Sequence, residues 1–90
     1  VYSSTGEMNY GVRNQEELLK VVEQQFRNEK TDHLDGLTIK SENWWFNLRP
    51  SNTEPLIRLN LEAESKSKCD EMLNVVENII VAFDESDGNH

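Results

Sequence analysis

The organisation of this 90-residue chain can be worked out from one stretch, Leu48-Arg49-Pro50-Ser51-Asn52-Thr53-Glu54-Pro55-Leu56-Ile57-Arg58. The runs on its two sides, residues 44–48 and residues 56–61, alternate between apolar and other residues with a period of two. Such alternation is typical of half-buried β-strands. The stretch therefore predicts two strands joined by a loop that is longer than a two-residue hairpin turn.

The loop itself is rich in hydrogen-bond donors and has a restricted backbone. Prolines at positions 50 and 55 limit its conformations, so little entropy is lost when it is ordered. Between them Ser51, Asn52 and Thr53 supply two hydroxyls, an amide and backbone N–H groups, and Arg49 adds a planar fork that matches two oxygens of a phosphate. This chemistry suits a tetrahedral oxyanion. Ser, Asn and Thr are also ordinary turn residues that bond to the local backbone, so the residues alone leave a plain turn as the alternative.

The same residues resemble a known motif. Arg49-Pro50-Ser51-Asn52-Thr53-Glu54-Pro55-Leu56 looks like the phosphate-binding loop in the C-terminal domain of the α-D-phosphohexomutases, the phosphomannomutase/phosphoglucomutase superfamily. Residues 6–10 resemble the first strand of that domain, residues 35–37 its second, and residues 59–63 with the following helix its end. The resemblance extends from about Gly6 to Phe83.

The resemblance implies a function and a set of site residues. In this family the loop holds the phosphate that is not transferred, which implies that Arg49, Ser51, Asn52 and Thr53 bind the phosphate of a hexose phosphate. The family interconverts hexose 1-phosphate and hexose 6-phosphate through a phosphoserine, with Mg²⁺ held by a cluster of aspartates, and these groups lie in three preceding domains. This sequence has no Asp-x-Asp-x-Asp run and no comparable serine motif. We therefore expect no catalytic residue and no metal ligand in this chain, and no activity from it alone.

One position narrows the family. Phosphoglucosamine mutases and eukaryotic-type phosphoglucomutases usually have Gly where this chain has Asn52. The residue favours the bifunctional phosphomannomutase/phosphoglucomutase branch.

Two charged residues near the loop have alternative roles. Arg58, on the polar face of the following strand, could add a second cation to the phosphate site or pair with Glu62 or Glu64. A carboxylate at Glu54 would repel an anion, so this residue is expected to orient the loop by accepting hydrogen bonds.

Two aromatic residues and a histidine complete the candidates. Trp44 and Trp45 are adjacent on a strand and so face opposite ways, and Trp44 is expected in the core. Trp45 could cover the open face of the sheet, contact another domain or touch ligand. His33 has no companion ligand at a metal-binding spacing and is expected to be exposed to solvent.

Composition limits the partners and the compartment. The net charge is −8, which disfavours binding to nucleic acid or to an anionic membrane, and there is no signal-peptide pattern or membrane-length apolar run. The other expected partners are further domains of the same chain. Cys69 is the only cysteine, so a reducing, cytoplasmic setting is predicted, with the thiol buried on a helix.

The remaining elements follow from periodicity. We expect an interdomain linker at residues 1–6, a domain at residues 7–83 and a disordered tail at residues 84–90. Within the domain we expect a strand at 7–12, a helix from an N-cap at Asn14 to about Glu29, strands at 37–41, 44–49 and 57–63, and a helix from Ser65 or Ser67 to Phe83.

The order of elements predicts an α+β fold, β-α-β-β-β-α. Its four strands form a largely antiparallel sheet, and both helices cover the apolar face. The family resemblance adds that the sheet is similar to that of the TATA-binding protein. The alternative function is a stand-alone α+β module that binds a protein or peptide through Trp45 and its polar neighbours, with the Arg49 loop only a turn.

Overall fold

The computed structural model describes residues 2–88, which form one sheet and two helices. The elements are β1 (Ser3–Gly11), α1 (Gln15–Gln25), β2 (Lys30–Asp32), β3 (Leu37–Lys40), β4 (Trp44–Pro50), β5 (Leu56–Ala63) and α2 (Lys66–Gly88).

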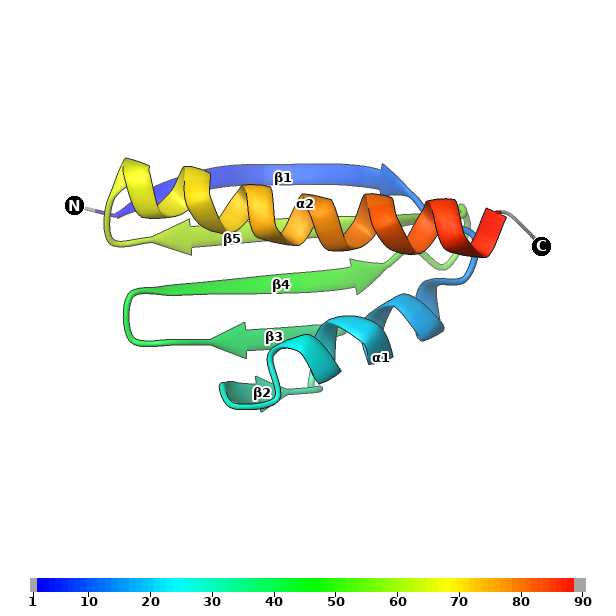
Figure 1. Cartoon of the computed structure of the whole chain (residues 1–90), viewed down its shortest axis with the longest axis horizontal. Coiled ribbons are helices and arrows are strands. Elements are labelled where there is room, and N and C mark those ends of the chain that lie inside the picture. The colour runs from blue at the N-terminus through cyan, green and yellow to red at the C-terminus, as the bar shows by residue number, and fades with distance from the viewer. Residues whose placement is uncertain (1, 89–90) are drawn as a thin grey trace.

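The sheet has the strand order β1-β5-β4-β3-β2, and each neighbouring pair is antiparallel. Both helices lie on one face, with α2 along β1 and β5 and α1 beside β3 and β4 (Figure 1). The predicted α+β class and the placement of both helices on one face are confirmed. The opposite face, which neither helix covers, is called the open face below.

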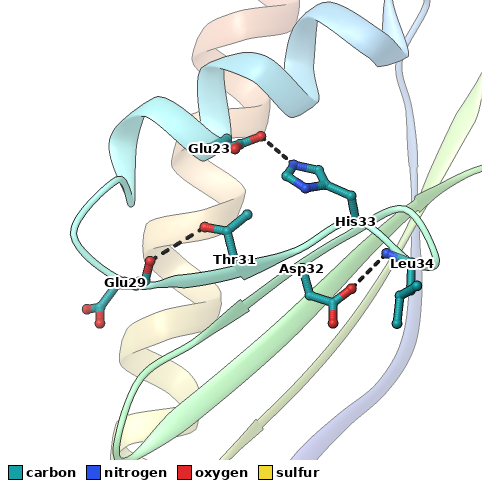
Figure 2. Close-up of polar contacts among 6 residues, drawn as sticks. All are labelled: Glu23, Glu29, Thr31, Asp32, His33 and Leu34. Carbon is teal, nitrogen blue, oxygen red and sulfur yellow. Dashed lines mark hydrogen bonds and ion pairs between the residues drawn. The ribbon is translucent and has the colours of Figure 1, made fainter.

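The sheet has five strands, because residues 30–32 form an edge strand where we expected a polar connection. β2 pairs with β3, and all three of its residues are exposed. An edge strand needs only backbone pairing and no buried side, so the apolar alternation on which the prediction relied is missing. Figure 2 shows its local contacts: the Thr31 hydroxyl donates to the Glu29 carbonyl (3.5 Å), and the Asp32 carboxylate accepts from the Leu34 N–H (2.7 Å).

The first helix also ends earlier than expected, at Gln25 instead of about Glu29. Phe26 caps it with an N–H to the Val22 carbonyl and directs its ring into an aromatic cluster. The Phe26 ring centre lies 5.6 Å from that of Trp44 and 5.2 Å from that of Phe46, both edge-on. This packing fixes the chain direction after the helix.

β1 begins at Ser3, so residues 3–6 lie in the sheet, where we expected an interdomain linker; Val1 lies outside the described residues. The pairing with β5 shifts between Ser4 and Glu7, where Thr5 and Gly6 together face one residue, Leu61. This is a β-bulge, and Gly6 takes the positive φ of 67° that it requires. The Thr5 hydroxyl accepts from the Leu61 N–H (3.3 Å). The residues before Glu7 are small and polar, which is why the strand was expected to start after them.

The core lies between the sheet and the helices. β4 and β5 alternate as predicted, with one set of side chains buried and the other facing away. Trp44 packs on the core at 5.8 Å from Phe46, as expected, and Cys69 is buried on α2. The fully buried side chains include Phe46, Leu48, Ile57, Leu59, Leu61 and Val76.

α2 continues beyond Phe83 to Gly88, where we expected a disordered tail; residues 89–90 lie outside the described part. No proline or glycine interrupts the helix before Gly88, and each added residue gains a backbone hydrogen bond without a new nucleation cost. At the other end the Ser65 hydroxyl accepts from the Lys68 N–H (3.1 Å), which confirms Ser65 as the N-cap. Asn14 stands at the N-cap of α1 but its side chain makes no capping bond.

Candidate functional site

Two arginines are direct partners on the open face. Arg49 on β4 and Arg58 on β5 face each other in the antiparallel register, and Asn9 on β1 is the next residue in the same row. Opposite residues in such a pair project from the same side of the sheet. Like charges placed directly opposite destabilise a sheet, so this pair is unfavourable unless an anion offsets it.

Arg49 is held from the β2–β3 side. Its Nη1 donates to the Asp35 carboxylate at 3.3 Å, while the Arg49 side chain remains 43% exposed. The Asn47 amide donates to the Asp35 carbonyl (2.7 Å) and to the Thr38 hydroxyl (3.1 Å). One edge of the guanidinium is thus oriented by the protein, and its other donors remain for a ligand.

A glycine allows the turn that contains Asp35 to lie close to β4. Gly36 has a φ of +71°, and a Cβ built on it would lie 2.3 Å from the Leu48 carbonyl oxygen. Any other residue would clash there, so the Asp35–Gly36 turn can press against β4 only with glycine. The role of this turn in holding Arg49 was not predicted from the sequence.

Arg58 has a buried Nε without a hydrogen-bond partner in the part of the chain that the structure describes. The alternative pairing of Arg58 with Glu62 or Glu64 is not among the ion pairs of residues 2–88. An unsatisfied, desolvated N–H costs free energy, and an acceptor supplied by a ligand or by water would remove that cost.

The loop between β4 and β5 closes through backbone bonds from the Ser51 N–H to the Leu56 carbonyl (3.0 Å) and from the Leu56 N–H to the Glu54 carbonyl (2.8 Å). The Ser51 hydroxyl accepts from the N–H groups of Thr53 and Glu54, at 3.3 Å each. These bonds are those of a turn residue, yet the hydroxyl keeps its own proton to donate. Asn52 and Thr53 are exposed at the tip.

Residues 12–15, which lead into α1, hold the loop in place through hydrogen bonds. The Gln15 side chain, at the start of α1, donates to the carbonyls of Glu54 (3.1 Å) and Leu56 (2.6 Å), and the Val12 N–H donates to the Pro55 carbonyl (2.9 Å). Glu54 therefore helps to orient the loop through its backbone carbonyl, whereas we expected its carboxylate to do so. Nothing in the sequence pattern pointed to Gln15, because a polar residue in the first turn of a helix is common.

The structure thus brings all five predicted residues to one end of β4 and β5. Arg49 and Arg58 share a row, and Ser51, Asn52 and Thr53 follow directly in the loop. Trp45 lies on the same open face, half-buried, two rows away.

The other candidates lie elsewhere. His33 is 64% exposed, as expected, and its Nε2 lies 2.8 Å from the Glu23 carboxylate (Figure 2). Within residues 2–88 no three His, Cys, Asp or Glu side chains gather as a metal site would require. None of the helices in this range is long and apolar enough to cross a membrane.

Two pKa shifts occur on the helix-covered face. Burial raises the pKa of the Cys69 thiol above its usual value, and the neighbouring Asp70 adds to this effect. Burial also raises the pKa of Tyr10, whose hydroxyl donates to the Glu77 carboxylate at 2.6 Å. Both side chains are therefore neutral at pH 7, and the hydrogen bond from Tyr10 to Glu77 joins β1 to α2.

Comparison with known proteins places this geometry in a family. Residues 7–79 match the family model for the phosphoglucomutase/phosphomannomutase C-terminal domain. A phosphomannomutase from Methanocaldococcus jannaschii is 42% identical over 85 residues, which cover 94% of this chain and 19% of that protein. A phosphomannomutase from Escherichia coli is 41% identical over 64 residues (69% and 14%), and a probable phosphoglucosamine mutase from Pyrococcus abyssi is 34% identical over 65 residues (72% and 14%).

The chain spans less than a fifth of the length of each of these relatives. Their names include both phosphomannomutases and phosphoglucosamine mutases, so the branch indicated by Asn52 stays a prediction. The match covers most of the chain and includes the whole Arg49–Arg58 region. The chain therefore belongs to the phosphoglucomutase/phosphomannomutase family, as the C-terminal domain of a phosphohexomutase.

Proposed function

We propose that this chain binds the phosphate group of a hexose phosphate, as part of an enzyme that interconverts hexose 1-phosphate and hexose 6-phosphate. The observation that carries the proposal is the direct pairing of Arg49 with Arg58 on the open face, at the base of the loop that contains Ser51, Asn52 and Thr53.

A phosphate dianion matches this arrangement in charge. The two guanidinium groups carry two positive charges, of which the exposed Asp35 carboxylate offsets part, and a bound anion relieves the remaining repulsion between the arginines. The free donors of Arg49, the Ser51 hydroxyl and the exposed donors of Asn52 and Thr53 can each meet a different phosphate oxygen. A phosphate is recognised without regard to the carbon that bears it, so the same contacts serve both hexose phosphates.

The affinity of the chain alone is expected to be low. Its net charge of −8 opposes an anion, and the site is open to water and salt on one side. We expect a dissociation constant of about 1 mM or weaker, near −4 kcal/mol.

In the complete enzyme the contacts would act at a distance from the reacting atoms. Holding the phosphate that is not transferred orients the sugar and closes the cleft, while a phosphoserine elsewhere in the enzyme exchanges phosphate at the other end. In this proposal Mg²⁺ is held by a cluster of aspartates in another domain of the enzyme, as the family resemblance implies. A cytoplasmic enzyme is part of the same proposal.

The experiment is a ³¹P NMR titration of mannose 6-phosphate and of glucose 1-phosphate with the chain at constant ionic strength. Both resonances should shift and broaden, and Arg49→Gln should abolish most of the effect. Arg27→Gln is the matched control, because it removes the same charge from an exposed position in the turn just after α1.

If neither ligand responds, or if Arg27→Gln weakens binding as much as Arg49→Gln does, the proposal is wrong. In the first case, an interaction module for protein or peptide becomes the better account.

A further inference from the structure

Two segments of the proposed phosphate site are held by the same helix. Figure 1 shows α1 beginning at the end of the sheet where β4 leads into β5, and β3 starts at that end as well. One segment is the loop at residues 51–55, which carries the phosphate donors, and the other is the turn at residues 33–36, which carries Asp35. We infer that Gln15 and Glu23 of α1 are positioning residues for the phosphate site. The inference rests on the proposed function and concerns residues that do not contact the ligand themselves.

Gln15 fixes the loop through its side-chain amide. The amide donates to two carbonyls of the loop, those of Glu54 (3.1 Å) and Leu56 (2.6 Å). The Leu56 carbonyl also accepts from the Ser51 N–H (3.0 Å), and a carbonyl oxygen has two lone pairs for two such bonds. Gln15 therefore joins α1 to the backbone that presents the Ser51 hydroxyl.

Glu23 acts on the turn through His33. The His33 Nε2 lies 2.8 Å from the Glu23 carboxylate (Figure 2). Two residues further on, the Asp35 carboxylate accepts from the Arg49 guanidinium at 3.3 Å. The turn is thus held to α1 on one side and to β4 on the other. Contacts from both sides limit the positions of Asp35, and with it the direction of the Arg49 fork.

The helix that carries both residues is anchored in the core. Leu18 and Val22 lie between Gln15 and Glu23 in the sequence, and both are fully buried. The two positioning residues are separated by ~12 Å along the helix axis, at 1.5 Å per residue. A helix packed in this way keeps the loop and the turn at a constant separation before the ligand arrives. Such preorganisation raises affinity, because less conformational entropy is lost on binding.

Both residues can be replaced without loss of the fold. The His33 and Glu23 side chains are 64% and 42% exposed, and exposed ion pairs contribute little to the free energy of unfolding. Alanine also has a higher helix propensity than Gln or Glu. An alanine variant at either position should therefore keep α1 intact, which the thermal unfolding of each variant checks.

The first experiment measures the affinity for glucose 1-phosphate and for inorganic phosphate by NMR titration at constant ionic strength. Gln15→Ala should weaken the binding of both ligands about three- to tenfold, the range expected for one or two hydrogen bonds. Gln24→Ala is the matched control, because it makes the same change at an exposed position of the same helix and should leave both affinities unchanged.

Glu23→Ala should weaken phosphate binding about twofold, the scale of an exposed ion pair. Removing a negative charge from a chain of net charge −8 favours an anion, so the predicted loss is opposite in sign to the general electrostatic effect. Glu23→Gln keeps an acceptor for His33 and should retain native affinity. Glu16→Ala, the same change at an exposed position of α1, should not weaken binding.

Double variants separate the two supports. Gln15→Ala and Glu23→Ala act on different segments, so their fold-changes in affinity should multiply. Glu23→Ala should cause no further loss in a chain that already carries Asp35→Ala, because Glu23 acts on the ligand only through the turn and Asp35.

A measurement without ligand tests the two segments directly. Relaxation of ¹⁵N nuclei reports backbone motion on the ps–ns timescale. We expect greater mobility at residues 51–54 in Gln15→Ala and at residues 33–36 in Glu23→Ala, and no change in either control variant.

Each contrary outcome has a distinct meaning. If the native chain binds phosphate and Gln15→Ala binds it as tightly as Gln24→Ala does, the inference is overturned for Gln15 and the proposed function survives. A native affinity in Glu23→Ala, or an equal loss with and without Asp35→Ala, overturns it for Glu23. If the native chain binds neither ligand, the proposed function fails and the inference fails with it.

Discussion

At the scale of single residues, Arg49 is expected to act through its geometry as well as its charge. Lysine keeps the charge but loses the planar fork that can hold Asp35 with one nitrogen and phosphate with the others. Arg49→Lys should therefore weaken phosphate binding about tenfold, measured by NMR titration. Arg27→Lys should have no effect. Unchanged affinity in Arg49→Lys would remove Arg49 from the site.

Asp35 is expected to position Arg49. Its carboxylate is 68% exposed and accepts from the guanidinium, so its replacement should cost little stability. Asp35→Ala removes the acceptor and should weaken phosphate binding about threefold, the scale of one exposed hydrogen bond. Asp35→Asn keeps an acceptor without the negative charge and should bind phosphate at least as tightly as the native chain. An alanine variant with native affinity would show that Asp35 does not orient Arg49.

At the scale of elements, the parts that the sequence predicted are those that bury one side. β4, β5 and α2 carry regular apolar periods because one side of each meets the core, and their approximate positions were predicted correctly. β2 and the start of β1 were missed, since an exposed edge strand and a bulge depend on backbone pairing that no side-chain period records.

The candidate site, too, could be predicted only in part from the sequence. The loop residues and Arg58 were named from residue type and resemblance. Their supports, Asp35 and Gln15, come from distant parts of the chain, and only the fold brings them to the loop. A long-range hydrogen bond leaves no local pattern in the sequence.

The packing of α2 on β5 is expected to supply much of the stability. Leu59 and Val76 are fully buried on the two sides of this contact. Leu59→Ala should lower the free energy of unfolding by roughly 2–4 kcal/mol, and Val76→Ala by somewhat less, measured by urea denaturation. Small domains have a total stability of about 5–15 kcal/mol, so at the lower end of that range this loss leaves a substantial unfolded fraction.

A matched control is available on the surface. Leu34 is 93% exposed, so Leu34→Ala makes the same change without a cavity and should cost less than about 0.5 kcal/mol. Equal losses for Leu34→Ala and Leu59→Ala would contradict the core described above.

At the scale of the whole molecule, the chain is expected to bind hexose phosphate weakly and to convert none of it. All the groups assigned to the ligand bind it, and none of them is placed to transfer a phosphate. The assay combines purified chain, Mg²⁺, a hexose bisphosphate activator and mannose or glucose 1-phosphate. Turnover that persists through purification and disappears with a substitution in this chain would require a complete active site within it.

The central claim is that one phosphate is held between the Arg49–Arg58 pair and the loop. The most direct measurement is a map of backbone amide shifts during titration with glucose 1-phosphate at constant ionic strength. We predict the largest shifts at residues 49, 51–54 and 58, with α1 beyond its first turn and the outer side of α2 unaffected. Largest shifts around other basic residues, such as Lys20 on α1, Arg27 just after it, or Lys30 and Lys40 on the β2–β3 edge, would contradict this, as would no shifts at all.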